Sequence, residues 1–336
     1  MSRRKRSELP LSSRRRFLAL GAAAGLAATF PRPSLAFPDR PIRLIVPFSP
    51  GGATDVAARR WADGMKPVLG TVVIENKGGG GGVIGAAEVA RSRPDGHTLV
   101  FGNTSTQVLI PAIMPQPPYD PVKDFAGIYM VCLSPTCIVV NSAVPAQTLK
   151  ELIAYAKTNP SKLSYGSAGI GTMTNLSGEL FKLLIGAPDI THVPYKGSAP
   201  GVVDLASGHI PMMTPNVGGP LLEFHRAGKV RILAVASKER IKAAPDIPTA
   251  IEAGLPDMVA ANFNGLFAPA GVSDATLQKI ADVTRDLVKD ADVQNSLITS
   301  GFEPLLDSGI EPTNKMVADE LARWVPIMRQ AGFKMQ

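Results

Sequence analysis

Hydrophobic residues of this chain gather in short runs rich in β-branched side chains, which alternate with segments of helical periodicity. Short continuous apolar runs are typical of strands that are buried on both faces. Five such runs lie at 42–46, 72–74, 99–101, 138–140 and 232–235. Apolar residues recur at helical spacing in 54–65, 149–156 and 176–184. This alternation predicts an α/β protein whose parallel sheets are flanked by helices.

The chain has 336 residues and a formal charge of +7, but the excess charge is confined to the N-terminus. Eight of the 35 basic residues and one of the 28 acidic residues lie in 1–36, which leaves 27 of each sign in the remainder. Because nucleic-acid binding depends on a basic surface, we expect no nucleic-acid partner.

Residues 1–36 have the three parts of a signal peptide. A basic region precedes an apolar stretch at 17–30, which is too short to span a bilayer, and a small-x-small cleavage site lies at 34–36. Residues 13–18 (SRRRFL) resemble the twin-arginine (Tat) export motif. We expect cleavage after Ala36 and localisation of the mature chain in the periplasm. The alternative is a basic tail that precedes a membrane anchor.

The chain has two cysteines, Cys132 and Cys137, too few for a disulfide scaffold or a four-cysteine zinc site. They are five residues apart, so a local disulfide is one possibility. Two buried free thiols are the alternative that we favour.

Two glycine-rich loops are the strongest candidates for a binding site. Residues 48–55 follow the first predicted strand, residues 165–172 follow a short strand at Leu163, and each loop opens a helix. Ligands of open α/β sheets bind at the carboxyl ends of strands, where free N–H groups of a helix's first turn attract anions. The two loops therefore predict a site that grips both ends of a small dianion. The alternative is that their Gly, Thr and Asp residues are only turn and cap residues.

Motifs for other chemistry are incomplete. Residues 80–85 match the dinucleotide pattern G-x-G-x-x-G, but no acidic residue follows the next strand to hold a ribose. The four histidines are scattered and indicate no metal site. Ser167 is the best candidate nucleophile, and the sequence shows no partner for it. We therefore expect no catalytic residue and no cofactor.

Seven short motifs follow one another along the mature chain. They are FPDRPIR at 37–43, PFSPGGATD at 47–55, VIENK at 73–77, PDGHTL at 94–99, YDPVKDF at 119–125, YGSAGIGT at 165–172 and VPYKGSAP at 193–200. This ordered set resembles the solute receptors of tripartite tricarboxylate transporters, the Bug receptors.

The resemblance implies a two-lobed periplasmic binding protein of the Venus-flytrap type, with a helix-flanked sheet in each lobe. Lobe 1 would contain 37–139 plus 263–336 and lobe 2 would contain 140–262, with crossings near Val139–Asn141 and Asn262–Gly265. Such a receptor captures a small carboxylate and delivers it to the membrane permease subunits of its transporter. We expect it to act as a monomer, which suits a receptor that must close and dock.

The resemblance also implies a set of ligand-binding residues, because the family grips carboxylates through main-chain N–H groups and ordered water. The residues that match the family motifs are Ser49, Gly52, Thr54 and Asp55 in the first loop and Ser167, Ala168, Gly169 and Thr172 in the second. Phe48, Gly51 and Gly171 lie in the same loops, and Asn103, Thr104 and Asn216 are expected to line the cleft. Lys196 completes the set, although a solvated loop lysine is the interpretation that we favour for it.

Two positions depart from the family pattern. Asn175 occupies a position where the family commonly has histidine, and Gly78–Gly82 replace a segment that commonly contains proline. Two alternative functions are a secreted α/β enzyme and a sensory receptor for the same class of ligand.

Overall fold

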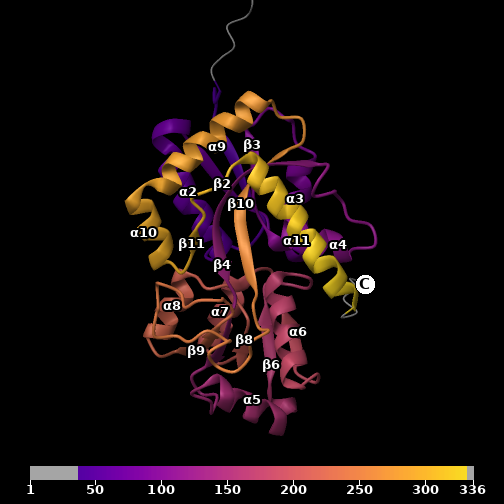
Figure 1. The fold of residues 1–336 in the computed structure, drawn as a ribbon, viewed down its shortest axis with the longest axis vertical. Helices are drawn as coiled ribbons and strands as arrows, with labels where there is room; N and C mark the ends of the chain where they lie inside the picture. The colour runs from indigo at the N-terminus through magenta and orange to yellow at the C-terminus, as the bar shows by residue number, and fades with distance from the viewer. Residues whose placement is uncertain (1–36, 331–336) are drawn as a thin grey trace, which may run out of the picture. The chain divides into compact units, whose positions relative to one another are not determined.

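The computed structural model of the chain describes residues 37–330 (Figure 1). The predicted export leader at 1–36 lies outside the described residues. The chain divides into a unit of residues 1–39 and a unit of residues 40–336, and the helices and strands described below belong to the second.

The first sheet is built from strands that come from both ends of this unit. Its strand order is β11-β4-β10-β3-β1-β2. The strands are β1 (Ile42–Val46), β2 (Val72–Asn76), β3 (Thr98–Asn103), β4 (Phe125–Pro135), β10 (Ala261–Pro269) and β11 (Glu303–Pro304). The accompanying helices are α2 (Ala53–Leu69), α3 (Val83–Ala90), α4 (Ile110–Ile113), α9 (Asp274–Lys289), α10 (Ala291–Thr299) and α11 (Ile310–Gln330). The short turns η1 (Gly80–Gly82) and η2 (Ser105–Leu109) precede α3 and α4, and η2 is a π-helical turn.

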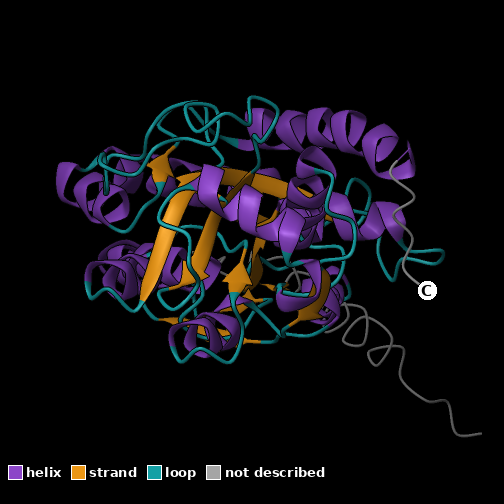
Figure 2. Ribbon diagram, turned by 90° about the horizontal axis from the view of Figure 1, so that it is seen from below, coloured by secondary structure: helices purple, strands orange, loops and turns teal. Residues whose placement is uncertain are grey.

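The second sheet is built from the middle of the chain, in the order β7-β6-β8-β5-β9. Its strands are β5 (Cys137–Asn141), β6 (Ser164–Ser167), β7 (Thr191–Pro194), β8 (Met212–Met213) and β9 (Val230–Val235). Its helices are α5 (Leu149–Thr158), α6 (Met173–Ile185), α7 (Ser198–Ala206) and α8 (Gly219–Arg226), with a 3-10 turn, η3, at Pro160–Lys162. Figure 2 shows the strands in orange with helices in purple around them.

Both sheets are mixed, so the prediction of parallel sheets was wrong in part. β1 pairs in parallel with β2 and β3, and β6 pairs in parallel with β7 and β8. However, β10 is antiparallel to β3 and β4, and β5 is antiparallel to β8 and β9. The antiparallel strands are those that carry the chain between the sheets in opposite directions, and antiparallel pairing follows from that reversal.

The two sheets are joined where β4 runs into β5 and where β10 returns. β4 ends at Pro135 and β5 begins at Cys137, so the first crossing lies at Thr136 and precedes the expected position at Val139–Asn141. The return lies at Ala260, just before the expected Asn262–Gly265. Thr136 joins both crossings, because its N–H donates to Ala260 O at 2.9 Å. The division into lobes with the expected boundaries stays a prediction.

The core follows from the apolar patterns. Helix α2 buries the face that the sequence predicts, which carries Ala57, Trp61 and Met65. The Trp61 Nε1–H donates to Thr284 Oγ1 on α9 at 3.0 Å, so the indole is both buried and hydrogen-bonded. Cys132 and Cys137 are buried free thiols, which confirms the alternative favoured for them. Within 37–330, no helix is long and apolar enough to cross a membrane.

Trp61 provides a test of this packing. Trp61→Ala is expected to lower the free energy of unfolding by about 3–5 kcal/mol, because it removes a large buried side chain and leaves Thr284 without its partner. Urea unfolding followed by circular dichroism measures the change. Arg60→Ala, an exposed position on the same helix, should alter stability by no more than about 0.5 kcal/mol. Equal effects of the two substitutions would contradict the packing.

Candidate functional site

A small cavity lies where the loops at the carboxyl ends of both sheets meet. Its free volume is about 20 Å³, close to the space of one water molecule. From the first sheet it is lined by Phe48, Gly52, Ala53, Thr54, Asn103, Ser105 and Asn262, and from the second by Ala168, Thr172, Thr174, Ser198 and Asn216. Eight of the twelve lining residues have polar side chains, and none of the twelve is ionisable.

Three helices begin at this cavity. Gly52, Ala53 and Thr54 form the start of α2, Thr172 and Thr174 form the start of α6, and Ser198 is the first residue of α7. Helix N-termini carry unpaired N–H groups and a partial positive charge, so their convergence favours an anion without any cationic side chain.

The three N-termini differ in how many of their N–H groups are free to bind a ligand. Neither α2 nor α7 has a side-chain cap. In α6 the Asn175 N–H donates to Thr172 Oγ1, and the Met173 N–H donates to Ser105 Oγ at 3.0 Å. In this state α2 and α7 therefore offer more free donors than α6 does.

The first loop is held in place by Asp55, which is buried. Its Oδ2 accepts the Gly51 N–H at 2.9 Å and an Arg59 N–H at 2.9 Å, and its Oδ1 accepts from Asn76 Nδ2 at 2.8 Å. Burial acts to raise the pKa of this carboxyl, but the hydrogen bonds from Arg59, Gly51 and Asn76 outweigh it and hold the pKa below its ordinary value. Asp55 thus orders the loop from behind and does not line the cavity.

The second loop is ordered by its own hydrogen bonds. The Ala168 N–H donates to Thr174 Oγ1, the Gly169 N–H donates to Ser167 Oγ, and the Gly171 N–H donates to Asn175 Oδ1. A ligand could use these three N–H groups only by displacing the protein acceptors. Asn175 supports the loop from behind, since its Nδ2 also donates to the Tyr165 hydroxyl at 2.7 Å.

Ser167 has a partner that the sequence did not reveal. Its Oγ lies 2.7 Å from His192 Nε2, and the His192 ring stacks on Tyr165 with 4.8 Å between centroids. Burial lowers the pKa of His192, which favours the neutral form of the ring. The pair is 25 residues apart in sequence and is brought together by the parallel pairing of β6 with β7. Ser167 is fully buried and does not line the cavity.

The glycine run 78–82 forms a close contact between the loops of the two sheets. A side chain at Gly81 would collide with Ile110 Cδ1 and would lie 3.0 Å from the Ile170 carbonyl oxygen of the second loop. A side chain at Gly197, before α7, would collide with Ser49 Oγ. Because both positions also have positive φ, only glycine gives this backbone its approach across the cleft. The run is therefore a contact surface between the two loops.

The structure brings together part of the predicted residue set. Phe48, Gly52, Thr54, Asn103, Ala168, Thr172 and Asn216 line the cavity, whereas Ser49, Gly51, Asp55, Thr104, Ser167, Gly169, Gly171 and Lys196 do not. Lys196 is exposed, as favoured for it. Ala53, Ser105, Thr174, Ser198 and Asn262 were missed. Helix starts could have identified Ala53, Thr174 and Ser198, but no local pattern marks Asn262.

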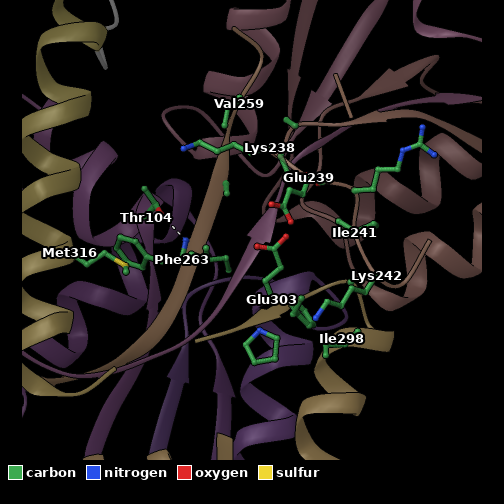
Figure 3. A pocket seen from close by; sticks show the side chains of 18 of the residues that line it. Thr104, Lys238, Glu239, Ile241, Lys242, Val259, Phe263, Ile298, Glu303 and Met316 are labelled. Atoms are coloured by element: carbon green, nitrogen blue, oxygen red, sulfur yellow. Dashed lines mark hydrogen bonds between the residues drawn. The ribbon is translucent and has the colours of Figure 1, made fainter. Parts of the chain in front are cut away.

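A second, larger cavity of about 690 Å³ lies beside the crossing strands and shares none of its lining with the small one (Figure 3). Thr104 lines it, and the Thr104 Oγ1 accepts the Phe263 N–H at 3.0 Å. Figure 3 shows the carboxylates of Glu239 and Glu303 turned toward one another. Burial and then the Glu239 charge raise the pKa of Glu303, while Lys242 opposes the shift. The charged residues that line the larger cavity are mostly exposed and carry both signs of charge. The small cavity is therefore the better candidate for a binding site.

The family model of the tripartite tricarboxylate transporter family receptor matches residues 57–333. The chain belongs to this receptor family. The BugT protein of Bordetella pertussis is 35% identical over 317 residues, which make up 94% of this chain and 96% of BugT.

Two solved structures connect the receptor family to the fold. The periplasmic binding protein BugD is 32% identical with a TM-score of 0.85, over 89% of this chain and 100% of BugD. MatC from Rhodopseudomonas palustris, solved with bound malate, is 31% identical with a TM-score of 0.82, over 87% of this chain and 99% of MatC. These similarities confirm the predicted two-lobed α/β fold of periplasmic binding proteins.

The contact made by the glycine run gives a test of cleft closure in this receptor. Gly81→Ala is expected to weaken ligand affinity by about tenfold, because a ligand stabilises the closed state only if the loops can meet. Gly186→Ala is the matched control, since Gly186 has a φ of 65°, close to the 68° of Gly81, with no atom within 4 Å of the added carbon. Isothermal titration calorimetry should show weaker binding for Gly81→Ala alone. Equal affinities in the two variants would contradict the contact.

Asp55 predicts a pH dependence of stability. Its pKa is lowered on folding, so its stabilising contribution is present above the unfolded pKa of about 4 and is lost as the pH falls through the lower folded value. Asp55→Asn should therefore lose about 1–3 kcal/mol at pH 7 and much less at pH 3. Urea unfolding at both pH values measures the difference. Asp63→Asn, an exposed carboxyl of the same helix, should show little change, and a pH-independent loss in Asp55→Asn would contradict the charge-based account.

Proposed function

We propose that this chain is a periplasmic solute receptor that captures a small carboxylate between two lobes and delivers it to the permease subunits of a tripartite tricarboxylate-type transporter. The single observation that carries the proposal is the small cavity at which α2, α6 and α7 begin, lined from both sheets. MatC, which has the same fold, was solved with bound malate, and this supports a carboxylate ligand.

The lining suits an anion that is held by helix dipoles and main-chain N–H groups and not by charged side chains. Charge-assisted bonds from main-chain N–H groups contribute roughly 1.5–3 kcal/mol each, so a few of them, less the closure cost, fit micromolar affinity of about −8 kcal/mol. One carboxylate of a dianion would bind at the N-terminus of α2. The second carboxylate would bind at the N-termini of α6 and α7. The neutral body of the chain, with 27 basic and 27 acidic residues in the 300 that follow the leader, fits a site of this kind.

Capture requires the lobes to open. A cavity of about 20 Å³ does not hold a dicarboxylate, so its two sides must separate to admit one. The two crossings are the only covalent connections between the sheets in the described chain, and few residues need to absorb the change in backbone angles. The ligand then favours the closed state by its greater affinity for that state.

We propose a receptor and not an enzyme. The Ser167–His192 pair is the strongest candidate for catalysis, but Ser167 is fully buried and its Oγ also accepts the Gly169 N–H. Within 37–330, no group of three His, Cys, Asp or Glu side chains is placed to hold a metal ion. We propose the monomer as the working form, because both sides of the cavity come from one chain.

The proposal predicts saturable, one-to-one binding of small dicarboxylates without turnover. In thermal-shift and calorimetric titrations of the purified protein, C4–C6 dicarboxylates should bind with micromolar affinity. Monocarboxylates of equal length should bind about tenfold more weakly or worse, because one end of the site stays unfilled. NMR of the recovered ligand should show it unchanged.

Failure has a distinct outcome. A folded protein that no anion in a broad panel stabilises would count against a carboxylate receptor. Deletion of the gene should abolish uptake of the identified ligand, which separates transport from sensing. Normal uptake with loss of a transcriptional response would favour the sensory alternative.

A further inference from the structure

The Oδ1 atom of Asn262 is a buried acceptor without a donor among the described residues. Asn262 lies on β10, lines the small cavity and is 3% exposed. An unpaired buried acceptor is rare in folded proteins, because it has lost its hydrogen bonds to water. Its position in the lining places it where a bound ligand can supply the donor.

Neighbouring hydrogen bonds fix which end of the amide is the acceptor. Asn262 Nδ2 donates to Asn216 Oδ1 at 2.7 Å, and Asn216 Nδ2 donates to Ser134 O at 2.8 Å. Ser134 O can only accept, so Asn216 must present its nitrogen to it and its oxygen to Asn262. The nitrogen of Asn262 therefore faces Asn216, and its oxygen is the free end.

A bare oxygen in the lining discriminates between carboxylates. The polar groups of a fully ionised, unsubstituted dicarboxylate are its carboxylate oxygens, which only accept hydrogen bonds. Such a ligand would leave Asn262 Oδ1 without a donor or would be repelled by it. A ligand with a hydroxyl or ammonium group on its carbon chain supplies a donor at that point. A site with a fixed hydrogen-bonding group rejects an analogue that lacks the partner much more strongly than it rejects a change in size.

We propose that Asn262 selects carboxylates that carry a hydrogen-bond donor on the carbon chain, such as hydroxy- or amino-substituted dicarboxylates. This inference rests on the proposed function, because it assumes that the small cavity holds the ligand. A hydroxyl group has one donor to match one acceptor. An ammonium group brings three donors and a charge into a lining without a carboxylate, so the hydroxyl compound is expected to bind more tightly.

The experiment compares ligands that differ only in the donor. Calorimetric titrations of the full purified protein use succinate, L-malate and L-aspartate, and the longer pair glutarate and 2-hydroxyglutarate. Within the pair of the preferred length, the hydroxy acid should bind at least about tenfold more tightly than its parent. The comparison with aspartate distinguishes the hydroxyl from the ammonium group as the donor.

The variant Asn262→Leu removes the acceptor at similar volume and should reduce the preference for the hydroxy acid to below about threefold. Asn295→Leu, the same substitution at an exposed position of α10, should retain the wild-type ratio. The ratio within a pair reports selectivity, so a general loss of stability does not alter it. If Asn262→Leu does not fold, the affinity ratio of hydroxy acid to parent acid in the wild-type protein still tests the proposed selectivity.

The outcomes separate this inference from the function on which it rests. Binding of the unsubstituted dicarboxylates as tightly as their hydroxy derivatives would overturn the role of Asn262 and leave the receptor intact. An unchanged ratio in Asn262→Leu would also overturn it. Absence of binding by every member of the panel would instead contradict the proposed function.

Discussion

The antiparallel pairing of β10 with β4 is the constraint on which the rest of the molecule depends. The pairing runs from Ala261 opposite Pro135 to Pro269 opposite Phe125, so the outgoing and returning segments are held together along their whole length. Thr136 fastens the pair where it leaves the first sheet: its N–H donates to Ala260 O, and its carbonyl accepts the Ala236 N–H at 2.7 Å. The second sheet continues directly from these strands (Figure 1), so the pairing helps to bring the loops of both sheets to one cavity.

The recognition that we propose for that cavity depends on oriented neutral groups. Helix N-termini supply donors, and buried side chains behind the loops hold those donors in position, as Asp55 does for the first loop and Asn175 for the second. No charged residue of the described chain lines the cavity, and Asp55, which lies behind the first loop, is paired with Arg59. Such a site is selective through geometry, because each donor and acceptor has one direction, while a flexible cation would attract any anion.

The sequence predicts local elements well because their causes are local. The apolar run at 42–46 forms β1, and the helical face of Ala57, Trp61 and Met65 is buried as its spacing predicts. The glycine-rich loops and the helices after them also lie where the pattern places them. The motif resemblance added the two-lobed fold, which periodicity alone does not determine.

What the sequence did not predict depends on contacts between distant segments. The antiparallel direction of β10 follows from the return of the chain and not from its apolar pattern. Asn262 lines the cavity because β10 places it beside Asn216, 46 residues away in sequence. His192 meets Ser167 through strand pairing, and the glycine run faces the second loop only when the sheets are assembled. Single motifs carry no information about such pairs.

Cys132 and Cys137 lie on either side of the crossing at Thr136, and both thiols are fully buried. Burial raises the pKa of each thiol, which suppresses the reactive thiolate. The fold is therefore completed without a covalent cross-link, and the chain can reach its native structure in a reducing compartment. Because both sulfur atoms are shielded from oxidants and from disulfide exchange, the two thiols of the folded chain respond little to a change from a reducing to an oxidising environment.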